Sequence, residues 1–311
     1  MKYAIVTLSV VLAGLLGVVV ASCGTGAGAQ SAGPVPGASG ATEPGISGSD
    51  TGGESPPAAT ETSGGTTNGS GSVSYQVWFH RGEELFVVHR TEKATPRVGS
   101  AAVSALLAGP SSSERSAGVD TQVPGGTKLL GLSIDKGIAT VDLTSEYQAG
   151  GGSASMTMRL AQVVCTLDQF PTVKGVLFKL DGQSVDVLGG EGIVIAHPLR
   201  CGNYNELLPA ILVESPAIGQ AVSNPVTISG TANVFEANVT VDIIDSDGRV
   251  VGTAFTTATC GTGCRGTFSV TIPYQVNALQ QGTIVVHDDD AAGNGHPPHE
   301  VHIPVTLKPA S

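Results

Sequence analysis

Between residues 73 and 195 the chain switches between two hydrophobic periods. Apolar and polar positions alternate over six short runs, which is the pattern of half-buried β-strands. The apolar positions of 97–108 and 153–170 instead fall on one face of a helix, and Pro110 and Pro171 end these helices. These residues therefore predict an α+β domain with two helices on a mainly antiparallel sheet. The predicted strands are 74–80, 85–90, 128–133, 138–143, 173–180 and 183–188.

The rest of the chain, from residue 210 to residue 308, contains only strand-like runs. They recur about every ten residues with turn residues between them, and seven such strands are typical of an immunoglobulin-like β-sandwich. Residues 196–209 form a segment that joins the two predicted domains. The predicted strands are 210–214, 226–232, 238–245, 253–259, 266–273, 282–288 and 299–307.

The N-terminus has the order of a secretory signal. Lys2 is followed by an uncharged apolar stretch and then by Ala21-Ser22-Cys23, so we expect residues 1–22 to be a signal peptide. Residues 20–23 resemble the bacterial lipobox, which implies that Cys23 carries a diacylglycerol. Two acyl chains hold a protein stably, which would place the chain on the extracytoplasmic face of the cell membrane. A plain signal peptide and an uncleaved anchor are the alternatives.

A long polar stretch follows Cys23. Residues 24–72 are almost entirely Gly, Ser, Thr, Ala and Pro, with too few apolar side chains to offset the entropy of ordering. We therefore predict a disordered linker, with a root-mean-square span of about 40 Å. Such a tether would hold the two domains away from the lipid and facing the cell wall.

The charge pattern excludes one class of partner. The net charge is −11, and the 15 lysines and arginines are scattered along the chain rather than gathered in a stripe, which argues against nucleic acid. The composition is rich in Gly, Ala and Thr, which is typical of a high-GC bacterium such as an actinomycete. No motif predicts a cofactor.

Catalytic motifs are also lacking. Ser133 and Lys136 have the Ser-x-x-Lys spacing but fall at a strand end and turn, whereas an acylating serine of that motif opens a helix. Gly151-Gly152-Ser153 lacks the following lysine of a phosphate-binding loop, and Ser153 is instead expected to cap the second helix. We expect no catalytic residues and no enzymatic activity.

Four cysteines remain once Cys23 is assigned to lipid. An even number in an exported chain predicts two disulfides. Cys260 and Cys264 flank Gly-Thr-Gly, which lets the backbone turn tightly, and Cys165 and Cys201 are then left for each other. Four cysteines allow three pairings, and metal binding or free thiols are the other possibilities.

One histidine-rich stretch offers candidate metal ligands. Imidazoles suit zinc, copper or nickel and carboxylates suit calcium. On a strand, however, Glu300 and His302 would share one side and His299 would face the other, which splits the cluster. We therefore favour a solvated polar loop and assign no metal. The candidate residues are His287, Asp288, Asp290, His296, His299 and His302.

Three aromatic residues are assigned to the hydrophobic cores. Tyr75 and Trp78 lie on the first predicted strand, where they could fill the core or form a binding face, and we favour the core. Phe235 is predicted to fill the core of the sandwich.

Particular segments resemble known domains. Those of the first domain are 106–110, 123–127 and 137–143, and those of the second are 215–216, 225–232, 235–237, 247–248, 265–268 and 303–305. On these residues the first domain is similar to the GerMN domain of sporulation and germination proteins, which also occurs in lipoproteins of non-sporulating actinobacteria. The second resembles the bacterial spore-germination immunoglobulin-like domain, and the two recur as a pair.

The resemblance implies a role in the cell envelope. We expect a non-enzymatic lipoprotein that serves as a binding or assembly module of the sporulation and germination type, with an envelope protein or peptidoglycan as its partner. The alternative is a ligand-binding lipoprotein that recognises a wall glycan, a peptide or a small solute between its two domains. An enzyme acting on the wall is the third reading, and no recognisable nucleophile and base support it.

Overall fold

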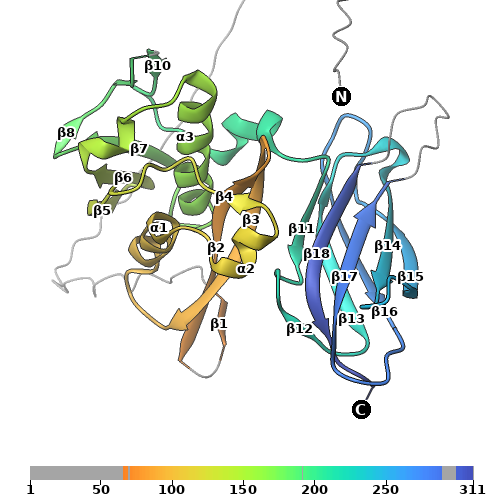
Figure 1. Ribbon diagram of the computed structural model, residues 1–311. Helices are drawn as coiled ribbons and strands as arrows, with labels where there is room; N and C mark the ends of the chain where they lie inside the picture. The colour runs from red at the N-terminus through yellow and green to blue at the C-terminus, as the bar shows by residue number, and fades with distance from the viewer. Residues whose placement is uncertain (1–65, 69–70, 191, 289–298, 311) are drawn as a thin grey trace, which may run out of the picture. The chain divides into compact units, whose positions relative to one another are not determined.

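The computed structural model describes residues 66–68, 71–190, 192–288 and 299–310. The predicted signal, Cys23, most of the linker, Asp290 and His296 lie outside these residues. The predicted fold class is confirmed, since an α+β domain is followed by a β-sandwich (Figure 1). Within the described ranges, no helix is both long and apolar enough to cross a membrane.

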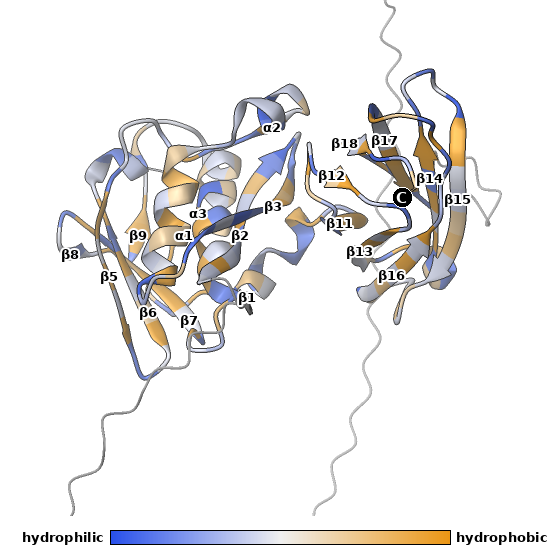
Figure 2. Cartoon of the chain, turned by 90° about the horizontal axis from the view of Figure 1, so that it is seen from below, coloured by the Kyte–Doolittle hydropathy of each residue, from blue (hydrophilic) through white to orange (hydrophobic). Residues whose placement is uncertain are grey.

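In the first domain two helices lie between two β-sheets (Figures 1 and 2). One sheet joins β1, β2, β3 and β4, and the other has the order β5-β6-β7-β8. The sheet strands are β1 (Thr66–Asn68), β2 (Ser72–Arg81), β3 (Glu84–Lys93), β4 (Val119–Asp120), β5 (Leu129–Asp135), β6 (Ile138–Leu143), β7 (Gly175–Leu180) and β8 (Gln183–Ser184). The helices and smaller elements are α1 (Val98–Ala108), α2 (Ser112–Ser116), η1 (Ser145–Gln148), α3 (Ser153–Asp168), β9 (Val187–Leu188), β10 (Ile193–Val194) and η2 (Cys201–Leu207).

The central position of α3 explains its burial. Eleven of its sixteen residues are buried, more than one apolar stripe would require, because a sheet covers it on each side. Its buried polar side chains bind the backbone of β2. The Trp78 amide donates to Thr166 Oγ1 (3.0 Å), and Gln162 Nε2 donates to the Trp78 carbonyl (3.2 Å). Gln169 makes the same pair of bonds with the amide and carbonyl of Gln76, both at 2.7 Å. These side chains satisfy the part of the β2 edge opposite β3 that lies between the residues paired with β1 and those paired with β4.

The arrangement of the strands differs from the sequence prediction in two respects. The predicted sheet is divided into two, and β6 pairs with β7 in parallel because α3 crosses over between them. Ser153 is also not the cap of α3: it is the first helical residue, Gly152 precedes it as the N-cap, and no side chain caps the helix. The two helices and the β7–β8 hairpin are found as predicted.

The short helix α2 was not predicted. It begins with a capping box in which Ser111 and Glu114 bind each other's backbone amides. Arg90 on β3 donates two hydrogen bonds to the Glu114 carboxylate, at 2.6 and 2.7 Å. Burial alone would raise the pKa of Glu114, but the bonds from Arg90 and the Ser111 amide hold that pKa below its usual value. Glu114 is therefore ionised, and its hydrogen bonds with Arg90 attach α2 to the sheet.

Both predicted disulfides are present, Cys165–Cys201 in the first domain and Cys260–Cys264 in the second. The first fixes the segment after β10 to α3, with the two Cα atoms 4.6 Å apart. Asp168 strengthens the attachment, because it accepts the Cys201 amide (3.1 Å) and forms an ion pair with Arg200. The beginning of the joining segment therefore belongs structurally to the first domain.

The second domain is a sandwich of a three-stranded sheet, β11-β13-β16, and a five-stranded sheet, β12-β18-β17-β14-β15. Each of the seven predicted strands overlaps an observed one, and β12 is additional. The alternate residues of both sheets that face each other are buried, which is the packing expected of such a sandwich. The strands are β11 (Ile211–Ser215), β12 (Ala221–Val222), β13 (Val226–Ala232), β14 (Asn238–Ile244), β15 (Val250–Thr257), β16 (Gly266–Ile272), β17 (Gln280–His287) and β18 (Glu300–Leu307).

The aromatic residues divide between core and surface. Tyr75 and Trp78 are buried, as predicted, but Phe235 is 43% exposed and does not fill the core. Phe235 opens the short 3-10 helix η3 (Phe235–Ala237), in which Glu236 and Ala237 both have positive φ angles. This tight turn buries Val234 and Ala237 and leaves Phe235 at the surface.

Candidate functional site

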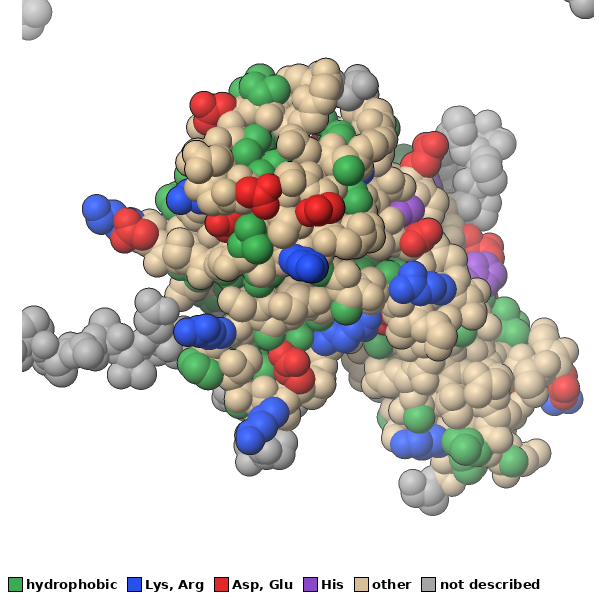
Figure 3. Space-filling model, turned by 60° about the vertical axis from the view of Figure 1, so that its left-hand side comes forward, with side chains coloured by type: hydrophobic (Ala, Val, Ile, Leu, Met, Phe, Trp, Pro, Cys, Tyr) green, Lys and Arg blue, Asp and Glu red, His purple; other side chains and the backbone are tan. Residues whose placement is uncertain are grey.

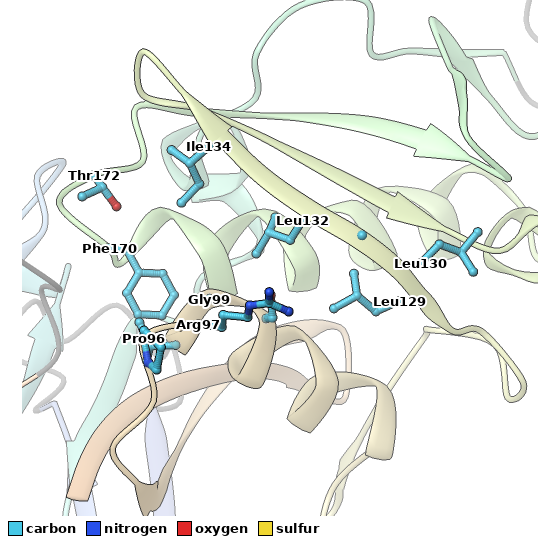
Figure 4. A pocket seen from close by; sticks show the side chains of 12 residues that line it. Pro96, Arg97, Gly99, Leu129, Leu130, Leu132, Ile134, Phe170 and Thr172 are labelled. Atoms are coloured by element: carbon cyan, nitrogen blue, oxygen red, sulfur yellow. The ribbon is translucent and has the colours of Figure 1, made fainter. Parts of the chain in front are cut away.

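A groove of about 560 Å³ runs along β5, opposite the N-terminal end of α1. Figure 4 shows Leu132, Phe170 and Arg97 around the same space, with Ile134 and Thr172 at one end and Leu129 and Leu130 at the other. The groove thus follows the length of a single strand. Its lining residues are Pro96, Arg97, Val98, Gly99, Ser100, Leu129, Leu130, Gly131, Leu132, Ile134, Phe170 and Thr172.

The groove forms because the helix layer covers β6 completely but β5 only in part. Ile134 pairs with Ala139 and faces the helices, yet Ile134 is 38% exposed whereas Ala139 is fully buried. Helix α1 approaches β5 closely at Gly99, where an added Cβ would lie 3.1 Å from Leu132 Cδ2. A larger residue at position 99 would therefore push into the floor of the groove.

The strand that borders the groove is the last of its sheet. In the part of the chain that the structure describes, β5 pairs with β6 and with no other strand. Natural edge strands are usually protected by lysine, proline or a covering element, because an open edge can pair with another chain. β5 contains neither lysine nor proline, and Leu130, at an irregularity in its pairing with β6, is 52% exposed. The edge is therefore apolar and accessible.

The groove carries a positive charge and no negative one. Arg97 is the only charged residue of its lining, and its exposed guanidinium has no ion-pair partner among the described residues. Helix α1 also begins here, without a side-chain cap and without an acidic residue in its first turn, so the helix dipole adds to the positive potential. The chain has a net charge of −11, so the charge of the groove is opposite in sign to that of the whole chain.

The lining is mainly apolar. Among the described residues, its side-chain hydroxyls belong to Ser100 and Thr172, and it contains no carboxylate, imidazole, thiol or amine. General acid–base catalysis needs such a group within hydrogen-bonding reach of the reacting atoms. What the groove offers is apolar surface, one cation and the backbone of an edge strand.

Comparison with known families identifies both domains. Residues 71–186 match the Germane family, described as "sporulation and spore germination", and residues 210–295 match the Gmad2 family, described as "immunoglobulin-like domain of bacterial spore germination". The chain carries a Germane domain followed by a Gmad2 domain. The groove lies in the Germane domain.

Parts of the chain are similar to solved structures of a Clostridium perfringens protein, described as a putative lipoprotein (22% identical, TM-score 0.32, covering 43% of this chain and 90% of that one), and of one sporulation protein. The first GerMN domain of GerM from Bacillus subtilis is 21% identical with a TM-score of 0.35, covering 41% of this chain and 97% of that one. The tandem GerMN domains of the same protein are 15% identical with a TM-score of 0.35, covering 77% of this chain and 62% of that one. No curated protein matches this chain.

The histidine-rich stretch lies in the second domain, where His287 Nδ1 lies 3.2 Å from the Asp288 carbonyl oxygen. Asp288 is buried and accepts a hydrogen bond from the His299 amide, and its other oxygen lies 2.9 Å from Nδ1 of the same residue. His302 contacts Glu300 on β18, and His287 lies 3.5 Å from Asp242. No three histidines, cysteines or carboxylates of the described residues are placed to hold one metal ion.

On the face shown in Figure 3, acidic and basic side chains are interspersed, and no continuous basic surface is seen. Ser133 and Lys136, the only match to a catalytic motif, lie at the end of β5 and in the turn that follows it.

Sequence reasoning did not find the groove. It predicted residues 128–133 as a strand, but the groove depends on that strand ending the sheet and on where α1 begins. One signal was available: the run Leu129-Leu130-Gly131-Leu132-Ser133-Ile134 is too apolar for an ordinary exposed edge and contains no lysine or proline. The capping box Ser111-Ser112-Ser113-Glu114 could likewise have indicated α2.

Proposed function

We propose that this chain is a non-enzymatic lipoprotein of the sporulation and germination type, anchored on the extracytoplasmic face of the cell membrane, that binds another component of the envelope. The observation that carries the proposal is the open groove of the Germane domain, whose lining provides binding surface but no general acid or base. The sporulation and spore germination families to which both domains match support the same role.

The anchoring part of the proposal is supported by the N-terminal sequence. Cys23 follows Val20-Ala21-Ser22 in the order of a lipobox, and the polar residues 24–65 separate it from the first described strand. A diacylglycerol on Cys23 would hold the chain at the membrane, and the polar segment would let the two domains reach toward the wall.

Replacing Cys23 with alanine is expected to move the protein from the membrane fraction to the soluble or secreted fraction, because the thiol that carries the lipid is lost. Both fractions of the native host are probed by immunoblotting, and lipid attachment is followed by labelling with palmitate. The Cys260→Ala, Cys264→Ala variant is the matched control and should remain membrane-bound and labelled. Palmitate labelling of the Cys23 variant would show that the lipid is attached elsewhere.

Binding at the groove is tested by site-specific photo-crosslinking in the native host. A photoreactive residue at position 130 is expected to capture a discrete envelope component, because Leu130 lies exposed in the groove. Position 187 is the control, since Val187 is an apolar strand residue of similar exposure, 49% against 52%, that does not line the groove. The same products from both positions, or none from position 130, would contradict a binding role for this surface.

A further inference from the structure

We propose that the groove binds an extended segment of a partner protein, which adds to β5 as a further strand of the sheet and pairs a carboxylate with Arg97. The inference rests on the proposed binding function and names the chemistry of the partner. Strand addition uses backbone hydrogen bonds for affinity and alternate side chains for specificity. Three features of the Germane domain support it.

The first feature is the contrast between two strand edges in the same domain. On the edge of β2 opposite β3, side chains of α3 and of Gln169, which follows it, bind the amide and carbonyl of Gln76 and Trp78, between the parts of that edge that pair with β1 and β4. No such bond covers the outer edge of β5 in the described part of the chain. The fold thus covers that part of the β2 edge with side chains but leaves the outer edge of β5 uncovered. The β5 edge is seven residues long, or about 20 Å.

The second feature is the row of apolar side chains beside this edge. Leu129, Leu132 and Ile134 pair with the fully buried Leu143, Val141 and Ala139, so they lie on the helix-facing side of the sheet although they remain partly exposed. Alternate side chains of an added strand would continue this row and pack against it. A sugar would find less to bind, because Phe170 is the only aromatic side chain among the described residues of the lining.

The third feature is the charge of Arg97. This guanidinium is the only charge in the lining and has no partner among the described residues, so an acidic segment is favoured. A second copy of β5 would not supply the carboxylate, because its single acidic residue, Asp135, alternates with Ile134 and faces away from the groove. The residues from 24 to 65 contain acidic side chains but no run of alternating large apolar ones. The occupant is therefore a segment of another protein.

The test uses the purified full chain and fluorescently labelled synthetic peptides of ten residues. One peptide alternates valine and threonine with a central glutamate, a second has lysine in place of the glutamate, and a third is the glutamate peptide with alternate backbone amides methylated. Binding is measured by fluorescence anisotropy. We expect the glutamate peptide to bind about fivefold or more tightly than the lysine peptide, and the methylated peptide to lose binding.

Variants of the chain connect these results to the groove. Arg97→Glu should reverse the preference between the glutamate and lysine peptides, whereas Arg115→Glu, at an exposed arginine outside the groove, should leave it unchanged. Leu130→Lys should abolish binding and Val187→Lys should not. The fluorescence of Trp78, the single tryptophan, checks that each variant has folded.

The outcomes separate this inference from the proposed function. If position 130 captures an envelope component in cells but no peptide binds, or the methylated peptide binds as well as its parent, strand addition is overturned and the binding role stands. If the chain associates with itself and Leu130→Lys disrupts this association, the occupant of the groove is a second copy of the chain, and the inference is overturned. If the Arg97→Glu variant kept the same preference between the two peptides, the inference that the partner segment is acidic would be overturned.

Discussion

Replacing Arg159 with methionine is expected to lower the free energy of unfolding of the Germane domain by about 3–5 kcal/mol. The Arg159 side chain is 3% exposed and donates hydrogen bonds to the carbonyls of Gln122 (2.9 Å), Tyr147 and Gly150 (3.2 Å). Burial lowers the pKa of Arg159, and no carboxylate pairs with it among the described residues. The substitution would leave these three carbonyls, and the more distant carbonyl of Ala149 (3.4 Å), without this donor at buried or partly buried positions.

The loss is measured by urea unfolding followed through the fluorescence of Trp78. Because this is the single tryptophan and it is buried in the first domain, its emission reports that domain alone. Arg159→Lys is the matched variant: it keeps the charge but cannot reach all three carbonyls, so it should lose most of the same stability. A loss of less than about 1 kcal/mol in Arg159→Met would show that water replaces the guanidinium.

Removing the disulfide between Cys165 and Cys201 is expected to cost about 3–4 kcal/mol of stability in the same domain. The bond joins residues 36 positions apart, and opening a loop of that length restores conformational entropy to the unfolded chain. Cys165 lies in the core on α3, whereas Cys201 begins η2. The Cys165→Ala, Cys201→Ala variant should also make the segment around η2 more susceptible to proteolysis, because only non-covalent contacts, among them those of Asp168 with Arg200 and of Leu199 with Val176, would then hold it.

The same Trp78 signal and limited proteolysis measure this effect. The Cys260→Ala, Cys264→Ala variant is the control, since its bond spans only four positions and lies in the Gmad2 domain. That variant should leave the Trp78 transition unchanged. An unchanged unfolding midpoint in the Cys165, Cys201 variant would show that the native contacts of η2 hold the segment without the covalent bond.

Much of the fold could be read from local patterns. The seven strands of the sandwich were predicted because inward and outward residues alternate, and both long helices because their apolar residues repeat every three or four positions. The disulfides followed from the tally of cysteines together with the glycines between Cys260 and Cys264. The prediction failed for Phe235 because two consecutive positive φ angles turn the chain at Glu236 and Ala237, and an apolar residue in sequence does not reveal such a turn.

The sequence by itself determined the two domains and their classes, since each follows from residue types and spacings within short stretches of chain, whereas it favoured one of three cysteine pairings and the structure decided that pairing. Only the tertiary structure decided that the strands of the Germane domain divide into two sheets, that β6 and β7 run parallel, and that β5 ends its sheet beside Arg97. The physical reason is that hydrophobic periodicity indicates which face of a strand is buried. Hydrophobic periodicity does not indicate which strands become neighbours or which strand remains at the edge of a sheet. These depend on packing between residues that are far apart in the chain.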